Sequence, residues 1–225
     1  MRKAIFWDFD GTLVRSNHLW SNSFLKAAGE LGSKYRLTYE TVHPLLCKGF
    51  PWDKDGTPNL KGEAWWSNVQ EKLSRDYRSL GLTAEEAACC SARIRGIVLS
   101  PENYKVYPDA APTLAVCIYK GYKNYLLSNN FPELEELLPK LWLDRFFSGC
   151  IVSGMVGADK PDEKIFRLAQ LKASFPSLCY MVGDSPEADA EGGKNAGMKT
   201  VLVHSAPSAR ADVVCDTLSD ILMYL

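Results

Sequence analysis

The chain has 225 residues, of which 46% are hydrophobic and 24% are charged. This composition is that of an ordinary folded protein, and it excludes a disordered chain or a mini-protein. Lysine and arginine number 26 and aspartate and glutamate number 27, so the formal net charge is −1. Because no excess of positive charge is available, we expect no binding to nucleic acid or to anionic membranes.

The first residues do not predict export. Arg2 and Lys3 are followed by the short apolar run 4–7 and then by Asp8, which leaves too little room for the core of a signal peptide. No apolar run approaches the roughly 18 residues that cross a bilayer. The seven cysteines form no C-x-x-C pair, which fits neither a disulfide framework nor a zinc site. We therefore expect a cytoplasmic protein with reduced thiols.

The first predicted element is a short strand near the amino terminus. Residues 4–7 read AIFW and end abruptly at residues 8–12, which read DFDGT. A continuous apolar run of this length is typical of a strand buried on both faces of a sheet. The sequence therefore predicts a central strand with acidic side chains at its carboxyl end.

The following segment, residues 16–100, predicts helices. Apolar residues recur at helical spacing over 20–31, and Gly32 is the expected end of that helix. A second apolar stripe covers 66–80. A third helix is predicted over 83–97, which opens with a Thr-x-x-Glu capping box. We expect this segment to be all-helical, with a looser stretch over 49–61 that is rich in Gly, Pro, Asp and Lys.

The remainder of the chain alternates between strands and helices. The predicted strands cover residues 122–127, 149–152, 178–182 and 200–203. Helical runs separate them, including 164–172 and 188–196. Repeated strand–helix units predict an α/β fold with a Rossmann-like parallel sheet and helices on both faces. Ligands of such sheets bind beyond the carboxyl ends of the strands.

Polar side chains gather at those predicted strand ends. They are Asp8, Asp10 and Thr12 after the first strand, Ser128 and Asn129 after the second, and then Lys160, Asp184 and Asp189. Each group alone has a structural explanation as a turn, a helix cap or a solvated side chain. Their common position at one edge of the sheet instead favours a site.

In this order the residues resemble the four motifs of the haloacid dehalogenase (HAD) superfamily, whose hydrolases form an aspartyl phosphate. The matching segments read DFDGTL at 8–13, LLSN at 126–129, DKP at 159–161 and GDSPEAD at 183–189. The resemblance covers the whole chain. It implies Mg²⁺-dependent hydrolysis of a phosphomonoester, with a small phosphorylated metabolite as the partner.

The resemblance implies that Asp8 is the nucleophile and Asp10 the general acid and base. It also implies that Mg²⁺ is held by Asp8, Asp184 and the backbone oxygen of Asp10, and oxygen ligands of this kind suit that ion. On an extended strand Asp10 starts on the same face as Asp8, because side chains alternate with a period of two. Haloacid dehalogenases lack an acid at the position of Asp10, so its presence favours phosphoryl transfer.

The remaining matched residues are expected to bind phosphate or to support the site. The resemblance implies phosphate binding by Ser128, Asn129 and Lys160. Thr12 is expected to tether Asp10 or its turn through the hydroxyl group. Asp189 is expected to support Lys160 or a metal-bound water, and its alternative is an exposed acid in the first turn of a helix.

The long insertion between Thr12 and Ser128 resembles the C1 helical caps of phosphoglycolate-phosphatase-like members. We expect residues 1–15 and 101–225 to form the catalytic core and residues 16–100 the cap. The motifs do not separate a phosphatase from a sugar phosphomutase such as the β-phosphoglucomutases. A catalytically silent binding protein on the same scaffold is a third alternative.

Aromatic and cationic side chains in the predicted cap are candidates for substrate recognition. They are Lys48, Trp52, Lys54, Trp65 and Trp66. Their alternative is structural, because Trp66 fits the apolar stripe of a helix and lysines are usually solvated. We expect no catalytic role for the histidines, which lie outside the motifs: His18, His43 and His204.

Overall fold

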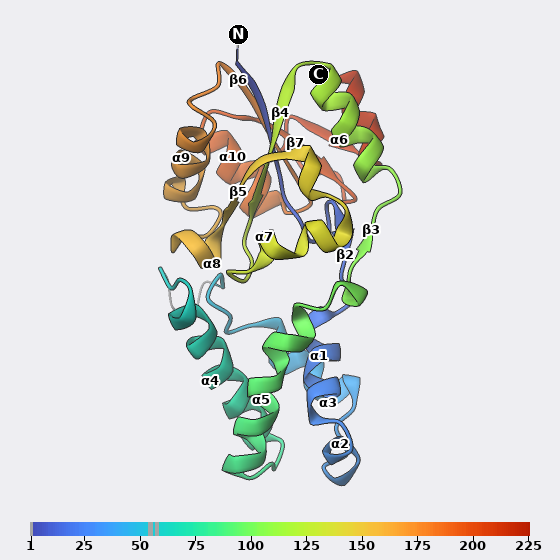
Figure 1. Cartoon of the computed structure of the whole chain (residues 1–225). Helices are drawn as coiled ribbons and strands as arrows, with labels where there is room; N and C mark the ends of the chain where they lie inside the picture. Colours follow the sequence, from blue (N-terminus) through green and yellow to red (C-terminus); the bar gives the residue numbers. More distant parts are fainter. Residues whose placement is uncertain (1, 54–55, 57–58) are drawn as a thin grey trace. The chain divides into compact units, whose positions relative to one another are not determined.

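The structure is a computed structural model, which describes residues 2–53, 56 and 59–225. Internal contacts divide the chain into two compact units, the first made of Met1–Ser16 with Tyr104–Leu225 and the second of Asn17–Asn103. We refer to them as the α/β unit and the helical unit and describe each by itself (Figure 1).

The α/β unit is built on a six-stranded sheet with the order β5-β4-β1-β6-β7-β8, in which every pair of neighbours is parallel. The strands are β1 (Lys3–Trp7), β4 (Tyr122–Ser128), β5 (Phe147–Val152), β6 (Leu178–Gly183), β7 (Lys199–Val203) and β8 (Val213–Cys215). The five strands predicted from apolar runs are confirmed within two residues at each end. The strand β8 was not predicted, because three residues are too few to show a pattern.

Helices cover both faces of this sheet (Figure 1). The helical segments are α6 (Ala110–Tyr119), α7 (Leu134–Leu137), α8 (Ser153–Val156), α9 (Glu163–Lys172) and α10 (Gly192–Asn195), with 3-10 turns at Pro139–Leu141, Asp144–Phe146 and Ser219–Met223. On one face, Phe6 and Met181 pack in a single buried cluster with Phe166 of α9. On the other face, the side-chain amide of Asn124 donates a hydrogen bond of 3.0 Å to the Leu114 carbonyl of α6.

The order of the strands fixes where a ligand can bind. From β1 the chain passes to β4 and β5 on one side, and it then returns to β6 on the other side of β1 and continues to β7. The direction of winding therefore reverses around β1, and ligands of open α/β sheets bind at such a reversal beyond the carboxyl ends of the strands.

A small antiparallel pair joins the ends of the segment that leaves and re-enters the α/β unit. It consists of β2 (Val14–Arg15) and β3 (Lys105–Val106), with Val14 opposite Val106. We did not predict this pair, since strands of two residues cannot show alternation.

The helical unit contains helices and no strand among its described residues. They are α1 (Leu19–Ala28), α2 (Leu31–Lys34), α3 (Tyr39–Val42), α4 (Glu63–Ser79) and α5 (Ala84–Val98), with 3-10 turns at His43–Cys47 and Pro101–Asn103. The capping box of Thr83 and Glu86 is present at the start of α5. The predicted end of the first helix at Gly32 is wrong. Gly29, with a φ of 52°, ends α1 three residues earlier, in a conformation that side chains disfavour.

Aromatic side chains form the centre of the helical unit. The rings of Phe24 and Tyr77 stack with centroids 3.6 Å apart, and the Tyr77 hydroxyl donates a 2.6 Å hydrogen bond to the Phe24 carbonyl. Trp65 and Trp66 are each 1% exposed. No helix among the residues that the structure describes combines the length and the apolar character needed to cross a membrane.

Candidate active site

The carboxyl ends of three adjacent strands bring the predicted residues together. Asp8 directly follows β1, Ser128 is the last residue of β4, and Asp184 directly follows β6. The Asp8 amide donates a 2.9 Å hydrogen bond to the carbonyl of Val182 on β6, so the ladder continues one residue beyond β1. This register places the Asp8 carboxylate beside the loop that carries Asp184.

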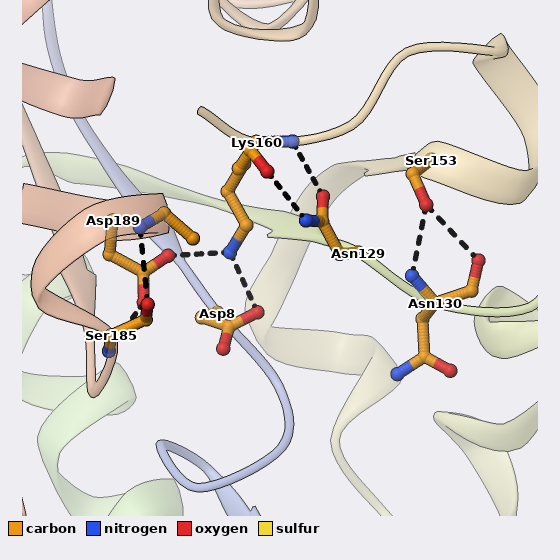
Figure 2. Close-up of polar contacts among 8 residues, drawn as sticks. Asp8, Asn129, Asn130, Ser153, Lys160, Ser185 and Asp189 are labelled. Carbon is orange, nitrogen blue, oxygen red and sulfur yellow. Dashed lines mark hydrogen bonds and ion pairs between the residues drawn. The ribbon is translucent and has the colours of Figure 1, made fainter. Parts of the chain in front are cut away.

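The Lys160 ammonium lies between two of the acidic side chains (Figure 2). Its Nζ is 2.9 Å from Oδ1 of Asp8 and 2.6 Å from Oδ1 of Asp189. Burial alone lowers the pKa of Lys160, but the charges of Asp189 and Asp8 outweigh this effect and the pKa is raised. Lys160 is therefore a fixed cation that touches Asp8.

Carboxylates outnumber cations in this pocket. Oxygens of Asp8, Asp184 and Asp189 lie within 4.8 Å of one another. Burial, followed by the charges of Asp8 and Asp189, raises the pKa of Asp184. When all three carboxylates are ionised, Lys160 neutralises only one of them and two negative charges remain. A divalent cation would balance this charge, and oxygen ligands are those that hard cations prefer.

Asp10 lies in a tight turn after β1 and has an unusual carboxyl group. One of its oxygens, Oδ1, is buried and accepts no hydrogen bond from the residues that the structure describes. Burial, together with the charge of Asp8, raises its pKa to about 6, although hydrogen bonds with Ser16 and Asn130 oppose the shift. A carboxyl group with this pKa can hold a proton close to neutral pH, as a general acid must.

The turn is held by its backbone and by a close approach to Asp184. The amides of Leu13 and Val14 donate hydrogen bonds of 2.9 and 3.1 Å to the Phe9 carbonyl. Gly11 has a φ of 76°, and a Cβ atom there would lie 2.2 Å from Oδ2 of Asp184. Only glycine fits this position.

The predicted tether by Thr12 is not formed. Its hydroxyl oxygen is buried and has no hydrogen-bond partner within the described part of the chain. Thr12 therefore makes no side-chain hydrogen bond to Asp10 or to the turn.

The Asn129 side chain contacts the backbone of Lys160. Its Nδ2 donates to the Lys160 carbonyl at 2.8 Å, and its Oδ1 accepts from the Lys160 amide at 2.7 Å (Figure 2). The carboxamide thus pairs with the backbone of Lys160 as a neighbouring strand would. These two hydrogen bonds tie the end of β4 to the backbone of Lys160, and phosphate binding by Asn129 stays a prediction.

Asp189 is a buried member of the site. It lies in a π-helical turn, Pro186–Glu191, and is 1% exposed, which excludes the alternative of a solvated acid. Besides its contact with Lys160, its Oδ2 accepts a 3.0 Å hydrogen bond from the Ser185 amide. The predicted helix over 188–196 is therefore two pieces, this π-helical turn followed by α10.

Comparison with known proteins agrees with this arrangement. Residues 2–197 match the haloacid dehalogenase-like hydrolases. The chain belongs to this family. Phosphatases of the family generally use a divalent metal, and the acidic cluster of this hydrolase has the charge and the ligand atoms to hold one.

Two curated relatives and one solved structure illustrate the similarity. The hydrolase is 30% identical over 184 residues to a phosphoserine phosphatase of Thermus thermophilus, covering 76% of this chain and 72% of that protein. It is 32% identical over 209 residues to haloacid dehalogenase-like hydrolase domain-containing protein 3 of Mus musculus, covering 89% and 81%. A crystal structure of a HAD phosphatase from Thermococcus onnurineus has the same fold, with a TM-score of 0.69 at 23% identity over 99% of this chain and 97% of that one.

Several supporting residues of the hydrolase were missed from the sequence. Asn130 and Ser153 join the ends of β4 and β5, where the backbone amide of Asn130 donates a 3.1 Å hydrogen bond to the Ser153 hydroxyl (Figure 2). His204, for which no catalytic role was predicted, has its Nδ1 3.0 Å from the Gly11 carbonyl. The sequence offers one indication that Ser153 and His204 lie near the site, namely that each directly follows a predicted strand.

The candidate substrate contacts in the helical unit divide into three groups. Trp65 and Trp66 belong to the core of that unit, and this burial was the alternative stated for Trp66. Lys48 is exposed and Trp52 is half-buried, with the Trp52 ring stacked on Phe50 at a centroid distance of 4.8 Å. Lys54 lies outside the described residues.

Proposed function

We propose that the protein is a Mg²⁺-dependent phosphatase that hydrolyses a small phosphomonoester through a phosphorylated Asp8. The observation that carries the proposal is the pairing of Asp8 with the buried ammonium of Lys160, next to a second acid, Asp10, whose pKa is raised to about 6. A phosphate ester repels an anionic nucleophile, so attack by a carboxylate requires positive charge beside it.

In the first step an oxygen of Asp8 attacks the phosphorus atom. A new bond forms between that oxygen and phosphorus, and the bond from phosphorus to the ester oxygen breaks. Asp10 gives its proton to the departing oxygen, which leaves as an alcohol. A Mg²⁺ ion held by Asp8, Asp184 and the backbone oxygen of Asp10 would supply neutralising charge for the phosphoryl oxygens.

In the second step Asp10 acts as a base. Its carboxylate takes a proton from a water molecule as the water oxygen attacks phosphorus. The bond to Asp8 breaks, inorganic phosphate forms, and both acids return to their starting state. One residue therefore serves both halves of the reaction, in line with a pKa between that of an ordinary carboxyl group and neutral pH.

Lys160 and Ser128 are assigned to the phosphoryl group. Lys160 is fixed by its two carboxylate contacts, and Ser128, which is 1% exposed, ends the strand next to β1. A fixed cation and a hydroxyl at the strand ends can hold phosphoryl oxygens. The helical unit, inserted between β2 and β3, is assigned the role of a cap, which favours small substrates over macromolecules.

The proposal is tested by assaying a panel of phosphorylated metabolites with Mg²⁺ and measuring both free phosphate and isomerised sugar phosphate. We expect release of free phosphate, and we expect the Asp8→Asn variant to lose it while its thermal unfolding stays close to that of the wild type. Isomerised sugar phosphate without free phosphate would identify a phosphomutase instead. Equal turnover by Asp8→Asn would refute the role of Asp8.

A further inference from the structure

His204 has a backbone conformation that needs an explanation. It directly follows β7 and has a φ of 53°, in the left-handed region that residues with a side chain disfavour. Residues held in this region cost energy and concentrate at functional sites, where their surroundings fix them. His204 is half-buried and lies at the same edge of the sheet as Asp8 and Asp184.

The His204 ring is held by a stack of side chains from the same unit. It lies on the ring of Tyr107 with centroids 4.0 Å apart and an angle of 19° between the planes. The guanidinium of Arg15 lies 4.7 Å from the centroid of the Tyr107 ring. The stack leaves the imidazole little freedom to rotate.

The imidazole points its Nδ1 at the turn that carries Asp10. Nδ1 lies 3.0 Å from the carbonyl oxygen of Gly11, and because a carbonyl can only accept, Nδ1–H is the donor. The Gly11 amide donates a 2.9 Å hydrogen bond to the Val14 carbonyl. Both peptide groups of Gly11 are therefore fixed, one by the turn itself and one by His204.

A fixed Gly11 matters because glycine has more backbone freedom than any other residue. Gly11 follows Asp10 directly and approaches the Asp184 carboxylate so closely that no side chain fits there. If the hydrogen bond from His204 were lost, rotation about Gly11 would move the Asp10 carboxyl group relative to Asp8. Proton transfer to a leaving group requires hydrogen-bond contact, so a small displacement weakens it.

We propose that His204 is a positioning residue for general acid catalysis, which it serves by holding the Gly11 carbonyl and thereby the Asp10 side chain. The inference rests on the proposed function, in which Asp10 protonates the leaving oxygen. It predicts that His204 matters most for substrates whose leaving group needs that proton. A residue that only stabilised the fold would affect all substrates alike.

The test uses two substrates of nearly the same shape and two substitutions that separate the donor from the ring. The departing phenolate of phenyl phosphate needs a proton, whereas that of 4-nitrophenyl phosphate leaves more easily. His204→Phe keeps a ring on Tyr107 and removes the donor. His204→Asn keeps a donor at the position of Nδ1, and asparagine tolerates the left-handed conformation.

We expect His204→Phe to lower kcat for phenyl phosphate about tenfold, a part of the 10² to 10⁴ that general acid catalysis supplies, with KM changed less than about twofold. For 4-nitrophenyl phosphate we expect a loss of less than about threefold, and His204→Asn should stay within about threefold of the wild type on both substrates. If His204→Phe does not fold, His204→Gly, which removes the donor without backbone strain, should show the same selective loss.

Three results would overturn the inference. They are unchanged turnover of phenyl phosphate by the variants without a donor, equal losses on both substrates, and a loss in His204→Asn as large as in His204→Phe. A wild-type enzyme that hydrolyses neither substrate would instead refute the proposed function, and the inference with it. An active wild-type enzyme with the wrong pattern of losses refutes the role of His204 alone.

Discussion

The Lys160 ammonium and the Asp189 carboxylate form an ion pair of 2.6 Å in which both side chains are almost fully buried, with 2% and 1% of their surface exposed. A buried pair of this kind adds little net stability compared with apolar groups, but removing one partner leaves an uncompensated charge. The same ammonium also contacts Asp8 at 2.9 Å. Lys160 therefore determines how many carboxylates the pocket can hold ionised.

We predict that Lys160→Met destabilises the metal-free protein by about 3 kcal/mol at pH 7, because three carboxylates then lie together without a cation. The loss should be smaller at pH 5, since burial and mutual repulsion already favour protonation of Asp184. Urea unfolding at both pH values measures the difference. Lys140→Met, at an exposed position, serves as the control. An equal loss at both pH values would contradict the electrostatic role.

The raised pKa of Asp10 predicts a pH-dependent cost to the metal-free fold. In the unfolded chain Asp10 releases its proton near its ordinary pKa of 3.8, whereas in the folded protein it does so at about 6. The contribution of Asp10 to the free energy of unfolding is therefore fully present below a pH of about 4. It decreases as the pH rises to about 6 and stays low above that pH.

Asp10→Asn removes this ionisation. As the pH is raised from 4 to 7, we expect the free energy of unfolding of the variant to increase by about 2 to 3 kcal/mol relative to that of the wild type. This is the free energy equivalent of the pKa shift. Chemical unfolding in the presence of a chelator measures the gain, with Asp216→Asn at an exposed position as the control. A difference between Asp10→Asn and the wild type that does not vary with pH would show that Asp10 is not strained by burial.

Gly11 offers a test of the close approach between the turn and Asp184. In Gly11→Ala the new Cβ would lie 2.2 Å from Oδ2 of Asp184, so the carboxylate must move. We expect Mg²⁺-dependent turnover to fall at least about tenfold, in keeping with the sensitivity of catalysis to displaced groups.

Gly197→Ala is a matched control for the backbone. Gly197 has a φ of 75°, close to the 76° of Gly11, but its added Cβ would meet no atom within 4 Å. This variant should lose about 1 kcal/mol of stability from the left-handed conformation and keep its turnover. Similar losses of turnover in both variants would mean that backbone strain, and not the displacement of Asp184, is responsible.

The sequence predicted the parts of this site that depend on strand ends. Asp8 and Asp184 follow apolar runs, and the parallel sheet brings the ends of those runs to one edge. The pairing of Asn129 with the Lys160 backbone was not predictable in the same way. It depends on the path of the loop between α8 and α9, which no periodic pattern records.

The contact of His204 with Gly11 also could not be predicted from local sequence patterns. The two residues are 193 positions apart, and the hydrogen bond requires a left-handed histidine whose conformation is set by the stack on Tyr107. Local sequence favours a turn after β7 but does not give the direction of the ring. The π-helical turn around Asp189 is likewise not recorded by any periodic pattern in the local sequence.

The central claim is that Asp8 carries the phosphoryl group during turnover. It is tested most directly by mixing the enzyme with Mg²⁺ and phenyl phosphate, quenching in acid during turnover, and locating the phosphoryl group by mass spectrometry of peptides. We predict a phosphoryl group on the Asp8 side chain in the wild type and its absence in Asp8→Asn. A phosphoryl group on any other residue, or active hydrolysis in which no phosphoenzyme forms, would contradict the account.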